Sequence, residues 1–367
     1  LLSRYDAVHG LLAELFLRVG CGIALDKNTL KLFMDTRDIL LWSGLVIGVL
    51  FGLNGQWSGF CLNRALKEGW DSGAKQKAQS FALALVVSIL GAQTLSAFEI
   101  VDLSTSIYRG NGASWLFVIL GGLMFGYGMM LANGCGARAV VLLGQGNLRS
   151  FVVLLCLGIS AYMTLTGLLA PLRLTLAQAT ALPAHGLFEF GLATRFALIG
   201  LLSVVLLTFV FWRGSIFNNK RDLVSGVVVG ALITAGWWVT GWLAVDEFEP
   251  APSVSLTFIA PIGETIQYTM IATGMRLGFG VTVIVGVALG SFVAAKLSKN
   301  FRLQGFATPA DMLRYMGGGA LMGVGGALAM GCSIGQGLTG FSTLTYASML
   351  AFAAMLLGAR LALRHTR

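Results

Sequence analysis

Two glycine-rich stretches of this chain, 197 positions apart, end on the same residue type. GGLMFGYGMMLANGC runs from Gly121 to Cys135, GGALMGVGGALAMGC runs from Gly318 to Cys332, and eight of the 15 aligned positions are identical. Both stretches lie inside long uncharged segments. Related apolar segments at so long a period are typical of a chain built from two structural halves.

The composition is that of a membrane protein. Only 11% of the 367 residues are charged, against about 25% in a soluble domain, and the mean hydropathy is +0.81. A membrane-spanning helix needs about 20 mostly apolar residues. Uncharged runs that meet or approach this length lie at 39–63, 78–98, 110–137, 150–172, 196–212, 223–245, 277–295 and 315–359, the last of which is long enough for two crossings.

The pattern predicts an all-α integral membrane protein with about nine transmembrane helices in one domain, over residues 39–363. A short apolar piece at 250–275, interrupted by Glu264, is typical of a re-entrant half-helix. Residues 1–38 are predicted to form an amphipathic, peripheral segment, with a further span as the alternative. Cys21 falls in this segment and receives no role.

Lysine and arginine indicate the orientation. They gather in the loops 64–77, 213–221 and 296–314 and in the C-terminal tail, which places these segments and the C-terminus in the cytoplasm. This distribution accounts for the net charge of +9 without nucleic-acid binding. The segment 114–133 then enters from outside and 311–330 from inside, and the related segments 43–59 and 225–241 are also opposed. The sequence therefore predicts two inverted-topology repeats, about 39–211 and 223–363.

Two of the five cysteines occupy equivalent positions in the repeats. Cys135 and Cys332 each follow a glycine, and such glycines let a helix stop and restart, so that its backbone N–H groups face an anion. A buried thiol is also a small membrane-core hydrophobe, and Cys156 is interpreted in that way. The glycines and polar residues predicted to support the thiols are Gly134, Gly136, Gly331, Ser333, Gln336, Asn133 and Arg138.

A third thiol, Cys61, has Leu243 as its repeat equivalent in the sequence alignment. Symmetric packing does not need a thiol on one side only, so this asymmetry favours a functional role for Cys61. The chain holds no CxxC and only three histidines, and it shows no hydrolase triad or phosphate loop. We expect neither a metal, nor a cofactor, nor an enzyme.

Three segments resemble a known family: LANGCGARAVVLLGQGN (131–147), MGCSIGQGLTGFSTL (330–344) and SGFCLNRAL (58–66). They are similar to the signature segments of the YeeE/YedE family of bacterial inner-membrane sulfur-compound transporters. The resemblance covers roughly residues 40–360 and implies a nine-helix, hourglass-shaped protein that imports thiosulfate. It implies a narrow central path lined by Cys61, Cys135 and Cys332, and a cytoplasmic TusA-like sulfurtransferase (YeeD) as a partner. A selenium compound stays open as the substrate.

The expected mechanism is a passage of the anion along neutral thiols, which offer weak S–H donors and a soft surface. Glu264 is one candidate for proton coupling. Two other classes remain open at this point: a membrane thiol or persulfide redox relay, and a scaffold without transport of its own.

Overall fold

The computed structural model describes residues 35–109, 114–181, 186–189, 192–212, 216–217, 219–245 and 253–365. Within these ranges the regular structure is helical, and the only β pairings are three isolated bridges. The all-α prediction is therefore confirmed. The peripheral segment predicted for residues 1–38, with Cys21, lies outside the described residues except for its last four positions, where the first described helix already begins.

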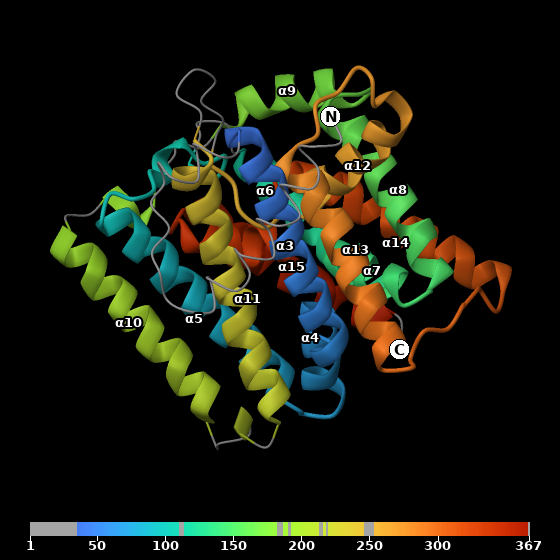
Figure 1. Ribbon diagram of the computed structural model, residues 1–367, viewed down its shortest axis with the longest axis horizontal. Helices are drawn as coiled ribbons and strands as arrows, with labels where there is room; N and C mark the ends of the chain where they lie inside the picture. Colours follow the sequence, from blue (N-terminus) through green and yellow to red (C-terminus); the bar gives the residue numbers. More distant parts are fainter. Residues whose placement is uncertain are drawn as a thin grey trace, which may run out of the picture.

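The described chain folds into long helices that are interrupted by short ones (Figure 1). The long helices are α3 (Thr36–Ser58), α5 (Gln76–Ala97), α6 (Trp115–Leu131), α8 (Leu148–Leu165), α10 (Leu192–Phe211), α11 (Lys220–Trp238), α13 (Phe279–Leu297), α14 (Pro309–Leu328) and α15 (Tyr346–His365). The short ones are α4 (Leu62–Asp71), α7 (Gly136–Gly144), α9 (Ala170–Ala179) and α12 (Ile259–Ile271), the 3-10 turns η1 (Leu103–Thr105) and η2 (Leu187–Glu189), and the π-helical turns η4 (Val239–Leu243) and η5 (Gly335–Gly340).

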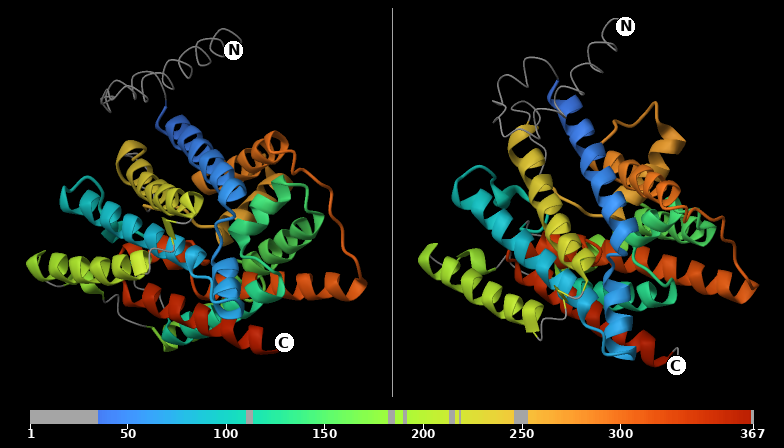
Figure 2. Two further views of the ribbon diagram at one scale, coloured as in Figure 1. Left: turned by 90° about the horizontal axis from the view of Figure 1, so that it is seen from below. Right: turned by 60° about the horizontal axis from the view of Figure 1, so that its bottom comes forward.

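In the part of the chain that the structure describes, eight segments are long and apolar enough to cross a membrane, which makes this a multi-pass membrane protein. The sequence predicted about nine crossings. The remaining one corresponds to α14, which has 20 residues but carries Asp311 and Arg314 near its start and is not among the eight. Helix α10 lies at the edge of the bundle (Figures 1 and 2), and only 17% of its apolar window is buried, against 44–61% in the other seven.

Helices α6 and α14 carry the glycine-rich repeat and pack directly against each other. A Cβ atom on Gly121 would lie 2.6 Å from the carbonyl oxygen of Gly325, and one on Gly318 would lie 2.9 Å from that of Gly128. Higher residue numbers in α6 therefore face lower residue numbers in α14, so the two helices are antiparallel. Gly121 is equivalent to Gly318 in the repeat, and Gly128 is equivalent to Gly325, so the two contacts are symmetry equivalents. A pseudo-twofold axis between α6 and α14 produces this pattern.

The outer helices obey the same symmetry. Helix α3 packs in parallel on α13, and α11 packs in parallel on α5. Gly48 of α3 approaches the backbone of Gly286, while Gly230 of α11 approaches the backbone of Ala84 at the matching level. Small residues let membrane helices come this close, because lipid supplies no hydrophobic force that would favour larger contacts. The antiparallel orientation predicted for the repeats is thus present in the packing.

The tight packing predicts which glycines tolerate a side chain. A Cβ on Gly126 in α6 would collide with the backbone carbonyl of Met355 in α15, whereas one on Gly200 in α10 meets nothing within 4 Å. We expect Gly126→Ala to lower the free energy of unfolding by about 1–3 kcal/mol, because an overpacked contact must open. Thermal unfolding in detergent measures this effect.

Gly200→Ala is the matched control, and it should be neutral or stabilising by up to about 1 kcal/mol, since alanine is the better helix former. If both variants melt together with the wild type, α6 and α15 are not in backbone contact.

Candidate functional site

Both repeat helices end in the same backbone turn. Asn133 (φ 56°) and Met330 (φ 58°) take the left-handed conformation after α6 and α14. The next residue then donates back into the helix, from Gly134 N–H to the Met129 carbonyl (3.0 Å) and from Gly331 N–H to the Gly326 carbonyl (2.8 Å). These bonds form a Schellman motif, which closes a helix and redirects the chain. Cys135 and Cys332 are the first residues after the turn.

The thiols sit where short helices begin. Cys135 is the N-cap of α7 and Cys61 is the N-cap of α4, and both have extended backbones. Cys332 lies three residues before η5, and its sulfur accepts the Gly335 N–H at 3.2 Å. A helix N-terminus carries unpaired N–H groups and about half a positive charge. The elements that follow the breaks therefore bring an electropositive backbone to the thiols.

The three thiols lie together in the interior. Cys61, Cys135 and Cys332 are 6%, 2% and 0% exposed, and all are free. The side chains of Cys61 and Cys135 are in contact with each other, and Cys135 also contacts the hydroxyl of Ser333, the neighbour of Cys332. The two repeat-matched thiols are near enough to interact electrostatically. A chain of contacts thus runs from Cys61 through Cys135 to Ser333 and Cys332.

The structure corrects one symmetry assignment. The sequence alignment made Leu243 the equivalent of Cys61, but the N-cap of α12, the counterpart of α4, is Phe258. The backbone of Phe258 faces the sulfur of Cys332, just as Cys61 contacts Cys135. The error arose because equivalent residues are offset by 182 in α3 and α11 but by 197 in α6 and α14, so additional residues lie between α11 and α12. Phe258 is fully buried, with its ring 5.3 Å from that of Phe51.

The residues predicted to support the thiols divide into two groups. Gly134, Gly331 and Gly136 form the breaks, and a Cβ on Gly136 would press against Ile262 at 3.2 Å. Ser333 lies in the thiol chain. Asn133 lies outside it, because its exposed side chain accepts a hydrogen bond from Lys67 at 3.0 Å and its role is that of the left-handed turn residue.

The two longer polar side chains point in different directions. Arg138 donates to the carbonyl of Gly55 at 3.0 Å, and its charge lies near Cys61 and Cys135. Gln336 is buried and folds back, donating to the Ala329 carbonyl at 2.6 Å. Cys156 is half-buried and packs on the α8 side of the α8–α14 contact, near Gly319, outside the thiol chain.

A polar cavity of about 330 Å³ opens next to Cys61. Four cationic side chains contribute to its wall, Arg64, Lys77, Arg138 and Arg221. The other lining residues are Gln56, Trp57, Ser58, Gly59, Gln145, Asn219 and Asn300. We call this space the basic cavity. Arg138 borders this cavity and also lies near Cys61 and Cys135.

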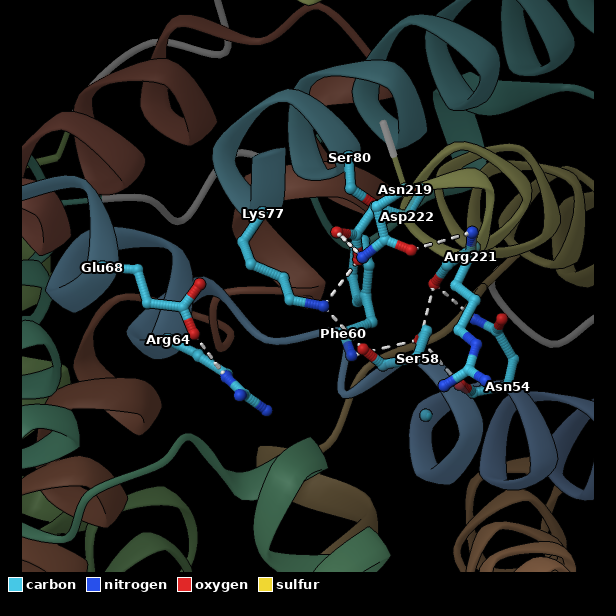
Figure 3. Close-up of polar contacts among 12 residues, drawn as sticks. Asn54, Ser58, Phe60, Arg64, Glu68, Lys77, Ser80, Asn219, Arg221 and Asp222 are labelled. Atoms are coloured by element: carbon cyan, nitrogen blue, oxygen red, sulfur yellow. Dashed lines mark hydrogen bonds and ion pairs between the residues drawn. The ribbon is translucent and has the colours of Figure 1, made fainter. Parts of the chain in front are cut away.

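A buried network fixes the segment that leads to Cys61 (Figure 3). Lys77 pairs with Asp222 at 2.6 Å and donates to the carbonyl of Ser58 at 2.7 Å. Ser225 accepts from Asn54 at 3.0 Å and lies 2.8 Å from the Ser58 hydroxyl. The network joins the end of α3 to the starts of α5 and α11. Sequence analysis used Lys77 only for orientation and missed Asp222, whose signal was a single acid at the start of an apolar span.

The comparison with known proteins decides the family. The family described as sulphur transport matches residues 57–361, which include all three thiols. The chain belongs to this family. The predicted YeeE/YedE resemblance is thereby confirmed, and the coarse function is the transport of a sulfur compound.

Several relatives of this sulphur transport protein carry more specific names. A thiosulfate transporter, TsuA, of Escherichia coli is 25% identical over 303 residues, covering 77% of this chain and 82% of its own length. TsuA of Spirochaeta thermophila is 26% identical over 313 residues, with 77% and 86% covered. A probable transporter, YedE, of Salmonella typhimurium is 31% identical over 94 residues, which are 25% of this chain and 21% of YedE.

The Lys77–Asp222 pair predicts a large stability effect. Lys77→Ala leaves the Asp222 carboxylate buried without its partner, and such a loss costs about 3–5 kcal/mol. We expect the variant to unfold at a much lower temperature in detergent, and the double variant Lys77→Met/Asp222→Leu to recover much of the loss.

Glu68→Gln supplies the control, because Arg64–Glu68 is a more exposed i,i+4 pair worth about 0.3–0.5 kcal/mol. Equal stability of Lys77→Ala and Glu68→Gln would show that the network does not hold α3, α5 and α11 together.

Proposed function

We propose that this protein takes up thiosulfate, or a closely related sulfur oxyanion, across the bacterial inner membrane along Cys332, Cys135 and Cys61 into the basic cavity. The observation that carries the proposal is the chain of contacts between the thiols at the beginnings of short helices. The names of the two TsuA relatives support the choice of substrate.

The chemistry of the site suits a soft dianion. Thiosulfate carries charged oxygens and one polarisable terminal sulfur. Protonated thiols offer that sulfur a weak donor and a soft surface, whereas thiolates would repel the dianion. The backbone N–H groups at the helix starts suit the oxygens. Each contact is weak, and a series of weak sites lets an ion move on where a single strong site would trap it.

The distribution of lysine and arginine supports an orientation in which the basic cavity is at the cytoplasmic end of the path. Entry of a dianion against an inside-negative potential costs about 4.6 kcal/mol per 100 mV. Glu264, the proposed proton carrier, is half-buried in α12 and lies beside Tyr162, outside the thiol chain. Consumption of the anion by a cytoplasmic TusA-like sulfurtransferase is the better supported driving force, because the basic cavity can hold an anion on that side.

The thiol path predicts a sharp difference among cysteine variants. Cys135→Ala and Cys332→Ala should each abolish growth on thiosulfate as the sole sulfur source, with normal amounts of protein in the membrane, because each interrupts the chain of contacts. Cys156→Ala, a core thiol outside the chain, should grow as the wild type does. Full growth of both path variants would reject the path, and failure of Cys156→Ala would reject its assignment to the core.

One observation favours a second candidate, a thiol or persulfide relay. Cys61 and Cys135 are in contact, so either thiol could resolve a persulfide formed on the other. In a relay, one thiolate attacks the terminal sulfur of thiosulfate, the S–S bond breaks, sulfite leaves, and the terminal sulfur stays on the protein as a persulfide.

Thiosulfate that carries ³⁵S only in its terminal position distinguishes the two candidates. Transport predicts that proteoliposomes accumulate intact, labelled thiosulfate and that the protein stays unlabelled. Labelled protein together with unlabelled sulfite would support the relay instead. Selenite as a competitor in the same assay tests the selenium alternative.

A further inference from the structure

Three buried polar atoms around Cys332 make no hydrogen bond of standard geometry with the described residues. They are the phenolic oxygen of Tyr108, the hydroxyl of Ser333 and the side-chain carbonyl oxygen of Gln336. The residues are 6%, 0% and 3% exposed. A buried polar atom without a partner is costly, so such atoms are rare and call for an explanation. Three of them beside one thiol indicate a place for a polar guest.

Tyr108 reaches this place from the loop that follows α5 and η1. A Cβ on Gly335, the residue whose N–H contacts the Cys332 sulfur, would lie 3.4 Å from the Tyr108 oxygen and 2.6 Å from the Thr257 hydroxyl. The ring of Tyr108 meets Trp237 edge-on at 6.4 Å. The phenol is therefore held in position, and its oxygen adjoins the hydroxyl of Thr257.

Gln336 also lies near the Tyr108 ring. A Cβ on Gly340 would lie 2.7 Å from the Gln336 oxygen and 3.0 Å from a ring carbon of Tyr108. The amide nitrogen of Gln336 is occupied by the Ala329 carbonyl. We call Tyr108, Thr257 and Ser333 the Tyr108 cluster. The Gln336 oxygen only accepts hydrogen bonds, so it is a neighbour of the cluster and not one of its anion-binding groups. The three hydroxyl groups of the cluster can each donate a hydrogen bond, and the thiol of Cys332 is near enough to Tyr108 to interact with it electrostatically.

The charge at this end of the molecule fits an anion. Arg109, the next residue after Tyr108, donates to the carbonyl of Thr343 at 3.2 Å. Burial and the nearby Arg195 lower the pKa of Arg109 to about 10, so its guanidinium stays charged at neutral pH. Helix α5 begins beside the basic cavity with Lys77 and runs 22 residues before this loop. The loop that carries Tyr108 thus follows the end of α5 that lies away from the basic cavity.

We propose that the Tyr108 cluster is a recognition site for the oxyanion end of the substrate, with Tyr108 as its specificity-determining donor and Cys332 facing the terminal sulfur. The proposal rests on the proposed function and deepens it. Hydroxyl donors fit sulfonate oxygens, whereas the thiol fits the one sulfur atom that distinguishes thiosulfate from sulfate. A site that hydrogen-bonds its ligand rejects analogues that leave its polar groups unpaired.

Tyr108→Phe tests this assignment, because it removes one oxygen and keeps the ring on Trp237. In proteoliposomes we expect the KM for thiosulfate to rise about tenfold or more, as for the loss of a hydrogen bond to a charged group, with the maximal rate within twofold of the wild type. Thr257→Val should raise the KM in the same direction. Tyr127→Phe is the matched control, since that phenol meets His365 at an exposed site, and its KM should not change.

An unchanged KM in Tyr108→Phe overturns the assignment, and so does a loss of maximal rate with the KM unchanged, because that result marks a structural residue. Should the wild type carry no thiosulfate, the proposed function fails, and thermal unfolding of detergent-solubilised protein in thiosulfate decides about the cluster. Stabilisation of the wild type and of Tyr127→Phe but not of Tyr108→Phe supports the site, whereas no stabilisation of the wild type overturns it.

Discussion

The backbone contact between α6 and α14 is the constraint on which the rest of the structure depends. The residues that touch are 121–132 in one helix and 318–329 in the other, so the helices cross in their C-terminal parts. Because the crossing lies near both C-termini, both helix ends lie close to the pseudo-twofold axis. Cys135 and Cys332 directly follow the Schellman turns, so they lie beside that axis. A larger residue at the crossing would separate the helices and, with them, the two thiols.

The repeat in the sequence carried most of this information. Identical glycines at equivalent positions predicted the repeat, and the distribution of lysine and arginine predicted that its halves are antiparallel. The family resemblance implied that Cys135 and Cys332 line one path. The sequence could not place Cys61 correctly in the symmetry. The additional residues between α11 and α12 change the offset of the repeat, and the alignment of 43–59 with 225–241 stops before them. Phe258 therefore had no visible connection with Cys61.

Sequence patterns could not predict the long-range polar contacts either. Lys77 and Asp222 are 145 positions apart, and each alone looks like an ordinary charge at the end of a span. Tyr108 lies in the loop before the segment 114–133, which was predicted to enter from outside, yet the fold buries its hydroxyl next to Gly335. In both cases the partners come from opposite halves of the chain. Their contacts depend on how the two repeats pack against each other. A periodic pattern within one segment cannot predict that packing.

The departures from symmetry bear on the direction of transport. A twofold frame alone would present the same path from either side, but here one end has a basic cavity with four cationic side chains and the other has a phenol, hydroxyls and Arg109. Fixed charges lower the energy of an anion equally for entry and for exit, so they cannot drive net flux by themselves. Under the proposed function, the basic cavity acts by keeping the anion on the cytoplasmic side long enough to be consumed. The inward direction then comes from the chemistry that removes the substrate, and the asymmetry of the protein makes that removal efficient.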